Sequence, residues 1–289
     1  MSAPFLVPAT LREACADGHR ANWLASLPDV VEAARVHWRL ELFAPYEPGG
    51  SAAWVAPARR ESGEPAVLKV GWPHPESADE AAGLAWWGGA GAVRLIDVAT
   101  MGAVPALLLE RCAPGQPLAA HATEEEQDGV IAGLLQRLWR EPPPDHHFRP
   151  LQQMCADWAN TAERRLGDAD RADPGLIKVG LDLFRGLPAT APDEVVLFTD
   201  LHAGNVLSAR REPWLAIDPK PYVGDPCYDV LQHLLNCGRL HTDPDPLLQR
   251  IAALTGLDPA RLRQWLFARC AIEAVDDPEL ARIAARLAP

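Results

Sequence analysis

The sequence lacks the features that carry a chain into or across a membrane. Its first twenty residues hold no basic segment followed by an apolar one, and no apolar run reaches about 18 residues. The six cysteines are scattered, with no C-x-x-C pair and no regular framework, which favours reduced and mostly buried thiols over disulfides. These absences predict a cytoplasmic protein that has no membrane partner.

Basic residues are outnumbered, with 27 lysines and arginines against 39 aspartates and glutamates and a net charge of -12. This balance argues against nucleic acid as the main partner and is compatible with a cationic ligand. Disorder is excluded, because 48% of the residues are hydrophobic and ten are tryptophans. With 289 residues, the chain is long enough to bury a sizeable core and to form two lobes.

Polar residues stand at predicted strand ends in the second half of the chain. A short apolar strand, Val195 to Phe198, stops just before Asp200, so this carboxylate lies at the exit of the strand. Asn205 follows five residues later, and Gly204 before it permits a tight backbone. The pattern predicts a polar loop that brings a carboxylate and an amide close together.

A predicted hairpin follows this loop, and Asp218 stands at the end of its return strand. Two carboxylates and an amide at the ends of adjoining strands can converge, and such oxygen ligands suit magnesium bound with phosphates. In kinases, one Asp orients the acceptor hydroxyl, an Asn binds a metal ion, and a later Asp holds the ions that bridge the phosphates. Asp200, Asn205 and Asp218 match those roles in order. Each alone also suits an ordinary loop or turn, but the three together favour a kinase site.

Two runs, T-D-L-H-A-G-N-V-L and I-D-P-K-P-Y-V-G-D-P-C-Y-D, resemble the aminoglycoside phosphotransferase family, most closely its streptomycin and hydroxyurea phosphotransferase branch. The commoner family loop is H-G-D-L-H-x-x-N, so Phe198 and Thr199 stand where His and Gly are usual. The resemblance implies an ATP-dependent kinase that uses Mg²⁺. It also implies a small acceptor that bears a hydroxyl group. A cationic, streptomycin-like compound is the first candidate, and its phosphorylation would confer antibiotic resistance.

The resemblance implies an α+β, two-lobe protein-kinase-like fold, with a five-stranded antiparallel N-lobe sheet with helices and a mostly helical C-lobe. Sequence patterns agree with it. Two helices are predicted over Pro8 to Arg35, the second beginning at Pro28, and helices dominate after Gly115. Between them, strands are predicted at Trp38 to Phe43, Ala52 to Ala56, Pro65 to Val70, Ala92 to Val98 and Pro105 to Glu110, with a helix at Pro75 to Trp87.

A glycine turn after the first predicted strand, Gly49-Gly50-Ser51, has two interpretations. Kinases cover the phosphates of ATP with backbone amides at the tip of such a hairpin. The same residues also form ordinary hairpin turns. Both interpretations stay open at the level of sequence.

Lys69 ends an apolar strand, like the V-A-I-K lysine that contacts the α- and β-phosphates in kinases. The alternative is an edge lysine with its ammonium group in solvent. In the resembling family, the acid that pairs with this lysine lies on the next helix. Glu80 is therefore the first candidate for this acid, and Glu76, one turn earlier, is its competitor.

The segment from Leu107 to Gly115 resembles the hinge between the lobes, where the backbone around Glu110 to Cys112 would contact adenine. A plain exit from a strand is the alternative. We accordingly expect a nucleotide-binding lobe over residues 1–111 and a catalytic and acceptor-binding lobe over residues 112–289.

Asp225 and Asp229 open a predicted helix that runs to about Cys237. The resemblance implies that both acids tie the metal loop and the catalytic loop together through backbone hydrogen bonds, and simple capping of the helix is the alternative. His202 is expected to support the loop geometry rather than transfer protons. His233 is expected to be a packed surface or core residue.

The last long helix carries Glu273 and Asp276 on a mixed face. These acids are candidates for binding a cationic acceptor. Alternatively, Arg269 and Glu273 form an i,i+4 pair on a solvated helix end.

Other functions remain possible at the level of sequence. A protein kinase is disfavoured, because no A-P-E-type segment follows Asp218. A kinase of hydroxyurea, a sugar or an amino-alcohol metabolite is not separated from an antibiotic kinase by the loop. A catalytically inactive nucleotide-binding protein is disfavoured, because Lys69, Asp200, Asn205 and Asp218 are all present.

Overall fold

The computed structural model describes residues 5–16, 18–166 and 173–289, except for the side chains of His19 and Glu76. The chain divides into two compact units, of which the first holds the chain up to Gly115 together with Ala209–Arg211 and the second holds the rest. The functions predicted for segments 1–111 and 112–289 stay predictions. Within the described residues, no helix is both long and apolar enough to cross a membrane.

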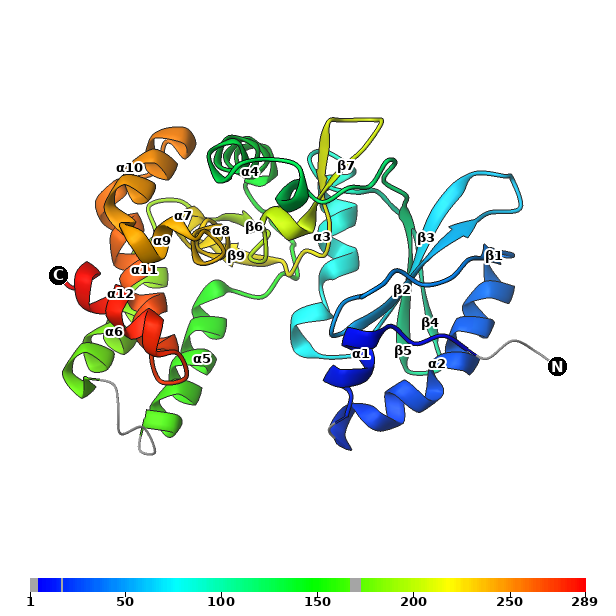
Figure 1. The fold of residues 1–289 in the computed structure, drawn as a ribbon, viewed down its shortest axis with the longest axis horizontal. Coiled ribbons are helices and arrows are strands. Elements are labelled where there is room, and N and C mark those ends of the chain that lie inside the picture. Colours follow the sequence, from blue (N-terminus) through cyan, green and yellow to red (C-terminus); the bar gives the residue numbers. More distant parts are fainter. Residues whose placement is uncertain (1–4, 17, 167–172) are drawn as a thin grey trace. The chain divides into compact units, whose positions relative to one another are not determined.

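The first unit is built on one five-stranded sheet (Figure 1). Its strands follow the order β1-β2-β3-β5-β4, and every neighbouring pair is antiparallel, which confirms the predicted sheet. The elements of this unit are α1 (Ala9–Ala14), α2 (Gly18–His37), β1 (Glu41–Leu42), β2 (Ala53–Arg59), β3 (Pro65–Gly71), the 3₁₀ turn η1 (Pro75–Ser77), α3 (Glu80–Trp87), β4 (Leu95–Met101) and β5 (Val104–Glu110).

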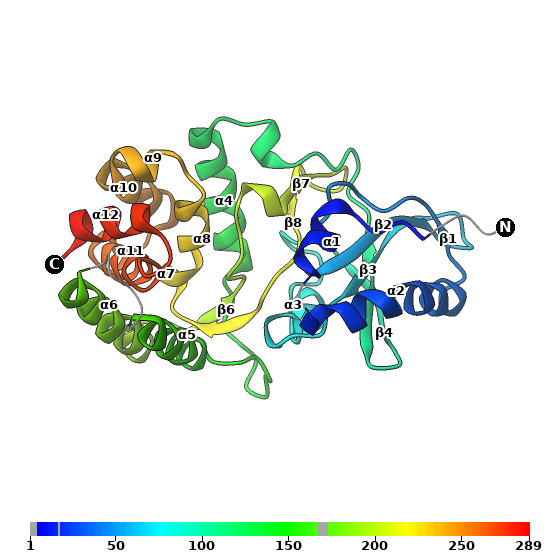
Figure 2. The same cartoon turned by 60° about the horizontal axis from the view of Figure 1, so that its bottom comes forward.

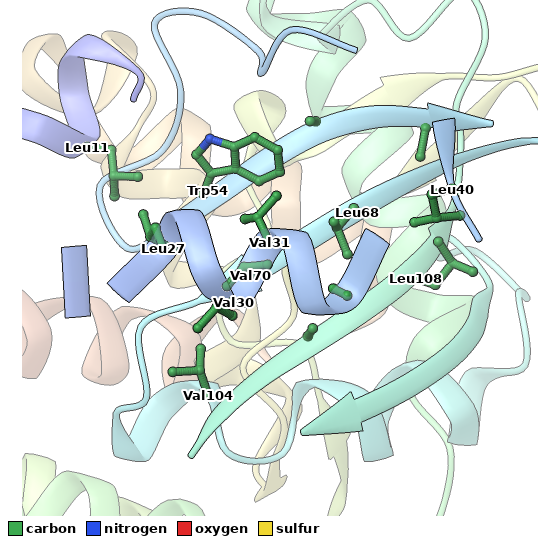
Figure 3. Packing of buried hydrophobic residues seen from close by; sticks show 14 of the residues in the cluster. Leu11, Leu27, Val30, Val31, Leu40, Trp54, Leu68, Val70, Val104 and Leu108 are labelled. Atoms are coloured by element: carbon green, nitrogen blue, oxygen red, sulfur yellow. The ribbon is translucent and has the colours of Figure 1, made fainter. Parts of the chain in front are cut away.

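One face of this sheet and helices α1 and α2 form a shared hydrophobic core. Figure 3 shows Val30 and Val31 of α2 near Leu68 and Val70 of β3, with Leu27 beside Leu11. Because side chains alternate between the two faces of a strand, the residues between these core positions point to the opposite face. Lys69 therefore projects away from this core.

The predicted start of a helix at Pro28 is wrong, because α2 runs through this residue. Proline has no N–H to donate within a helix and usually ends or kinks it. Here Leu27, Val30, Val31 and Ala34 are buried against the sheet. Tertiary burial of this apolar face outweighs the local signal of the proline.

The first predicted strand, Trp38 to Phe43, is only Glu41–Leu42 as a regular strand. Helix α2 continues to His37, and a turn at Trp38 and Arg39 follows it. The following chain still runs beside β2, where Phe43 donates its N–H to the Pro57 carbonyl at 3.0 Å. The chain therefore continues to pair with β2 beyond the two residues of the regular strand β1.

The second unit is mostly helical, with helices α5 and α6 running side by side (Figure 2). Its centre is α11, in which nearly every residue from Leu262 to Ile272 is buried. Its elements are η2 (Leu118–Ala120), α4 (Glu124–Leu138), α5 (Leu151–Leu166), α6 (Pro174–Gly186), η3 (Leu187–Thr190), β6 (Val195–Leu197), η4 (Ala203–Asn205), β7 (Val206–Ser208), β8 (Trp214–Ala216), β9 (Tyr222–Gly224), α7 (Pro226–Asp229), α8 (Leu231–Leu235), α9 (Arg239–Thr242), α10 (Pro244–Thr255), α11 (Pro259–Glu273) and α12 (Pro278–Leu287).

Two small antiparallel strand pairs in the second unit hold the polar loops. Strand β6 pairs with β9, and β7 pairs with β8. The helix predicted from Asp225 to Cys237 is instead two short helices, α7 and α8, which meet at Val230. Asp225 caps the first of them, and its helix ends at Asp229. The Asp229 carboxylate, at the end of α7, accepts hydrogen bonds from the chain that follows β6.

The close packing of α6 on α11 predicts a stability effect at Gly180. A methyl group there would lie 2.3 Å from Cβ of Ala271, so Gly180→Ala should lower the free energy of unfolding. We expect a loss of about 1–3 kcal/mol, measured by urea unfolding. Gly129→Ala on the exposed face of α4 is the control, because no atom lies within 4 Å of its added methyl group. This control should gain about 0.5–1 kcal/mol, and equal effects at the two sites would contradict the packing.

Candidate active site

Asp200 lies immediately beyond the end of β6. Its backbone N–H donates to the Phe198 carbonyl at 2.9 Å, and its side chain is partly buried. The Asp200 Oδ2 atom lies 2.9 Å from Nζ of Lys220. The carboxylate predicted to orient an acceptor hydroxyl therefore stands at a strand exit, as expected, with an ammonium group beside it.

Asn205 and Asp218 lie at the same end of the β7–β8 pair. Asn205 ends η4, and its backbone carbonyl accepts the N–H of Ile217 at 2.9 Å, directly before Asp218. The Asn205 amide nitrogen donates to the Asp200 carbonyl at 3.0 Å. Because the nitrogen is used in this way, the side-chain oxygen of Asn205 is the atom available as a metal ligand. The structure thus brings Asp200, Asn205 and Asp218 together within one unit.

His202 caps the turn that carries Asn205. Its Nδ1 accepts the N–H of Gly204 at 3.1 Å. Burial lowers the pKa of His202, an effect that the nearby carboxylates of Asp200 and Asp218 oppose. A neutral imidazole with Nδ1 as an acceptor fits the support of loop geometry expected from the sequence.

Asp229 is fully buried and holds the start of the catalytic loop. Its carboxylate accepts the N–H groups of Phe198 at 2.9 Å and Thr199 at 2.5 Å, and the indole N–H of Trp139 at 2.9 Å. Burial raises the pKa of Asp229 to about 6, although these hydrogen bonds act in the opposite direction. The backbone contact implied by the family resemblance is therefore present for Asp229.

Asp225 makes different contacts, and capping is the interpretation that describes it. Its Oδ1 accepts the N–H of Cys227 at 2.9 Å, and its Oδ2 accepts from Arg261 and from the indole of Trp265. These bonds join α7 to α11. In the part of the chain that the structure describes, the hydrogen bonds of this acid thus fix the helix that ends in Asp229.

Lys69 and Glu80 form a buried ion pair in the first unit. The ammonium nitrogen lies 2.6 and 2.7 Å from the two carboxylate oxygens, and the residues are 8% and 4% exposed. Glu80 is the first residue of α3, on the sheet face opposite the α2 core. The pairing favours Glu80 over Glu76, whose side chain lies outside the described part of the structure.

Glu110 uses its side chain to organise the end of β5. Its carboxylate accepts the N–H of Arg94 at 3.0 Å and two bonds of 2.9 Å from Arg211. Burial would raise the pKa of Glu110, but these bonds outweigh it and lower that pKa. Burial also raises the pKa of the Cys112 thiol to about 11, with Glu110 adding to the effect. Hydrogen bonding and burial thus account for the surroundings of both side chains. That the backbone of this segment contacts adenine stays a prediction.

The glycine turn packs against the start of the chain. Gly49 has φ +78°, and a Cβ there would lie 2.5 Å from Cβ of Pro8. Arg20 donates to the Ser51 carbonyl at 3.1 Å. Packing therefore explains Gly49 by itself, and phosphate contact by Gly49, Gly50 and Ser51 stays a prediction.

The two C-terminal acids each contact an arginine. Glu273 binds Arg269 at 2.7 Å, which is the i,i+4 pair considered from the sequence, and Arg269 also lies 4.4 Å from the ring centre of Trp158. Asp276 pairs with Arg165 at 2.6 Å, and both side chains are exposed. Binding of an acceptor by Glu273 or Asp276 stays a prediction.

His233 is a buried core residue within a charged cluster. Its Nε2 lies 2.9 Å from Oδ1 of Asp128, and Cys237 completes a trio whose ligand atoms lie within 4.8 Å of one another. Arg239 and Arg250 each bind the Asp128 carboxylate at 2.7 Å. Burial would raise the pKa of Asp128, but these hydrogen bonds lower it to about 2. Two guanidinium groups on one carboxylate disfavour a cation there, so the cluster joins helices and is distinct from the proposed magnesium ligands.

Comparison with known proteins identifies the family of this chain. The family described as aminoglycoside/hydroxyurea antibiotic resistance kinase matches residues 38–279. The chain belongs to this family. It is 34% identical to a streptomycin 6-kinase of Streptomyces glaucescens over 265 residues, which cover 89% of this chain and 85% of that protein. It is 35% identical to a hydroxyurea phosphotransferase of Kitasatospora aureofaciens over 284 residues, covering 96% and 81%.

A solved structure supports the kinase-like fold of this member of the aminoglycoside/hydroxyurea kinase family. An aminoglycoside phosphotransferase of Streptomyces rimosus, solved in complex with ADP and streptomycin, superposes with a TM-score of 0.57. The match covers 86% of this chain and 98% of that one at 17% sequence identity. At this identity the likeness shows the fold alone.

The structure explains how this family member departs from the H-G-D loop. Phe198 is fully buried and fills a packing position. Thr199 has φ +57°, a left-handed conformation that glycine adopts readily and a β-branched residue rarely does. Its hydroxyl donates to the Lys220 carbonyl at 2.5 Å, and this bond, with the N–H held by Asp229, offsets the strain.

Two features of the site were missed from the sequence. Lys220 lies within the run I-D-P-K-P, and Arg211 lies in the Arg210 to Pro213 segment between β7 and β8. The sequence has only three lysines, and this rarity is the one signal that could have drawn attention to Lys220. Arg211 stands among polar turn residues, so no local pattern distinguishes it.

Because the pKa of Asp229 is raised in the folded protein, its contribution to the free energy of unfolding should decrease as the pH rises. Because the folded pKa of about 6 exceeds the unfolded value of about 3.9, this group's contribution to stability is fully present below about pH 4 and is lost as the pH rises through about 6. The free energy of unfolding of the wild type minus that of Asp229→Asn should therefore fall by about 3 kcal/mol between about pH 4 and pH 7. Urea unfolding across this range measures it. A difference that grows as the pH rises would contradict the assignment.

Proposed function

We propose that this protein is an ATP- and magnesium-dependent kinase that phosphorylates a hydroxyl group of an aminoglycoside such as streptomycin, and so confers antibiotic resistance. One observation carries the proposal: the second unit brings Asp200, Asn205 and Asp218 together in a chain of the aminoglycoside/hydroxyurea kinase family. We also propose that it acts in the cytoplasm.

The donor atoms at Asn205 and Asp218 fit a magnesium ion. Mg²⁺ prefers oxygen ligands, and these residues offer an amide oxygen and a carboxylate at one end of the β7–β8 pair. When bound, magnesium would offset the negative charge of the ATP phosphates. The residues Asn205 and Asp218 would hold it.

The remaining site residues have separate roles in phosphoryl transfer. Lys69, oriented by Glu80, contacts the α- and β-phosphates. A bond forms between the acceptor oxygen and the γ-phosphorus, and the bond from that phosphorus to the β,γ-bridging oxygen breaks. ADP leaves with the electron pair of the broken bond, and the hydroxyl proton passes to the Asp200 carboxylate.

The acceptor is inferred from the family and from charge. Relatives at 34% and 35% identity are a streptomycin 6-kinase and a hydroxyurea phosphotransferase. The net charge of -12 favours the cationic aminoglycoside over the neutral hydroxyurea as the first candidate. Glu273 and Asp276 are proposed to contact this cation, although each shares its charge with an arginine.

A panel of acceptors tests the substrate class. We expect streptomycin to release ADP with the wild type and to gain one phosphate by mass spectrometry. Raising the salt concentration should raise the acceptor KM and leave the KM for ATP nearly unchanged, because screening weakens attraction of the cation. Turnover with hydroxyurea, a sugar or an amino alcohol but with no aminoglycoside would refute the class and leave kinase activity intact. ATP binding without turnover of any acceptor would indicate an inactive nucleotide-binding protein.

Two substitutions separate chemistry from metal binding. Asp200→Asn should reduce kcat by a factor on the order of a hundred or more while nucleotide affinity changes little, because this carboxylate acts on the acceptor hydroxyl. Asp218→Ala should instead abolish magnesium-dependent ATP binding or turnover. Steady-state kinetics and nucleotide titration with and without magnesium measure both. Near-normal turnover by Asp200→Asn would remove the central claim.

A further inference from the structure

Lys220 is fixed to the catalytic loop at three points. Its backbone N–H donates to the Phe198 carbonyl at 3.0 Å, and its carbonyl accepts the Thr199 hydroxyl at 2.5 Å. Its Nζ lies 2.9 Å from Oδ2 of Asp200. The backbone of Lys220 is thus anchored to the two residues that precede Asp200, so its side chain starts from a fixed position beside that carboxylate.

Lysine is rare in this chain, so its positions carry information. Of the 27 lysines and arginines, only three are lysines. Lys69 pairs with Glu80, Lys220 pairs with Asp200, and Lys178 lies exposed on α6. Two of the three therefore contact acids that we assign to phosphoryl transfer, and the third provides a matched control.

The chemistry of the side chain explains why lysine suits this position. An ammonium group is a compact charge that can bind one oxygen of a carboxylate, whereas a guanidinium group tends to bind both oxygens at once. Nζ of Lys220 binds Oδ2 of Asp200. An arginine there would compete with the acceptor hydroxyl for Oδ1.

The energetics favour a role in positioning over one in stability. The side chains of Lys220 and Asp200 are 32% and 17% exposed. Ion pairs in partly hydrated surroundings contribute little to folding. Fixing one rotamer of a reacting group, in contrast, affects the rate strongly, because small displacements from the reactive geometry slow the reaction.

We infer that Lys220 is a positioning residue for phosphoryl transfer, whose ammonium group holds Oδ2 of Asp200 so that Oδ1 faces the acceptor hydroxyl. This inference rests on the proposed function. As the oxygen of the acceptor bonds to the γ-phosphorus and ADP departs with the electrons of the broken bond, the hydroxyl proton moves to Oδ1. Lys220 acts only through Asp200 and exchanges no proton.

A double-mutant cycle tests this dependence on Asp200. We expect Lys220→Met to lower kcat by about 30- to 100-fold with the KM for ATP changed less than about twofold, because the loss lies in the transfer step. In an Asp200→Asn background, the same change should lower kcat by less than about threefold, because the group that it positions is gone. Lys178→Met is the control and should match the wild type in kcat and in Tm.

A second variant keeps the test independent of folding. Lys220→Arg preserves the positive charge and both backbone anchors, yet we expect kcat to stay at least about tenfold below that of the wild type, because guanidinium occupies both carboxylate oxygens. An unchanged Tm and nucleotide affinity in both Lys220 variants would show that they are folded.

Three outcomes would overturn the inference. These are full activity of Lys220→Met, full recovery by Lys220→Arg, and equal losses from Lys220→Met with and without Asp200. The last would mean that Lys220 acts directly on the phosphates. If instead the wild type phosphorylates no acceptor, the proposed function fails, and this result is distinct from an active wild type whose Lys220 variants are equally active.

Discussion

The geometry of the catalytic loop depends on one buried carboxylate, that of Asp229. It accepts the N–H groups of Phe198 and Thr199 and the indole N–H of Trp139. Three donors converge on a carboxylate that is fully removed from water. Three donors need an acceptor with several lone pairs on both of its terminal atoms. An asparagine at this position would place its own NH₂ group against one of the three N–H donors. The direction of the chain at Asp200 follows from this arrangement.

The carboxylate also permits strain where the loop needs it. Thr199 and Asp218 both have positive φ angles, 57° and 62°, which cost on the order of 1–3 kcal/mol each for residues other than glycine. The N–H of Thr199 is held by Asp229, and its hydroxyl is held by Lys220. Strained residues persist where their surroundings determine them in this way. The usual family glycine at position 199 would need fewer such contacts, so this chain reaches the same turn by hydrogen bonding.

Sequence patterns predicted the strands of the sheet and the helical second unit, because strand ends and turns are local signals, whereas the roles of the site residues stay predictions. Pro28 was misjudged, because burial of an apolar helix face against the sheet is a tertiary effect. The break between α7 and α8 was not predicted either. Lys220 and Asp200 are separated by a whole hairpin, and no local periodicity relates them. Contacts of this kind become visible only when the strands are paired.

The Lys69–Glu80 pair shows which interactions serve function more than stability. Both side chains are nearly excluded from water, at 8% and 4% exposure. Removing two charges from water is costly, and a buried ion pair is often no more stable than well-packed apolar residues of similar size. The neighbours of Lys69 on β3, Leu68 and Val70, are such apolar residues, so the strand itself does not require a charge. A lysine in this position, already oriented by a carboxylate, has a clear use when a polyanion binds, because its charge needs no reorganisation to meet a phosphate.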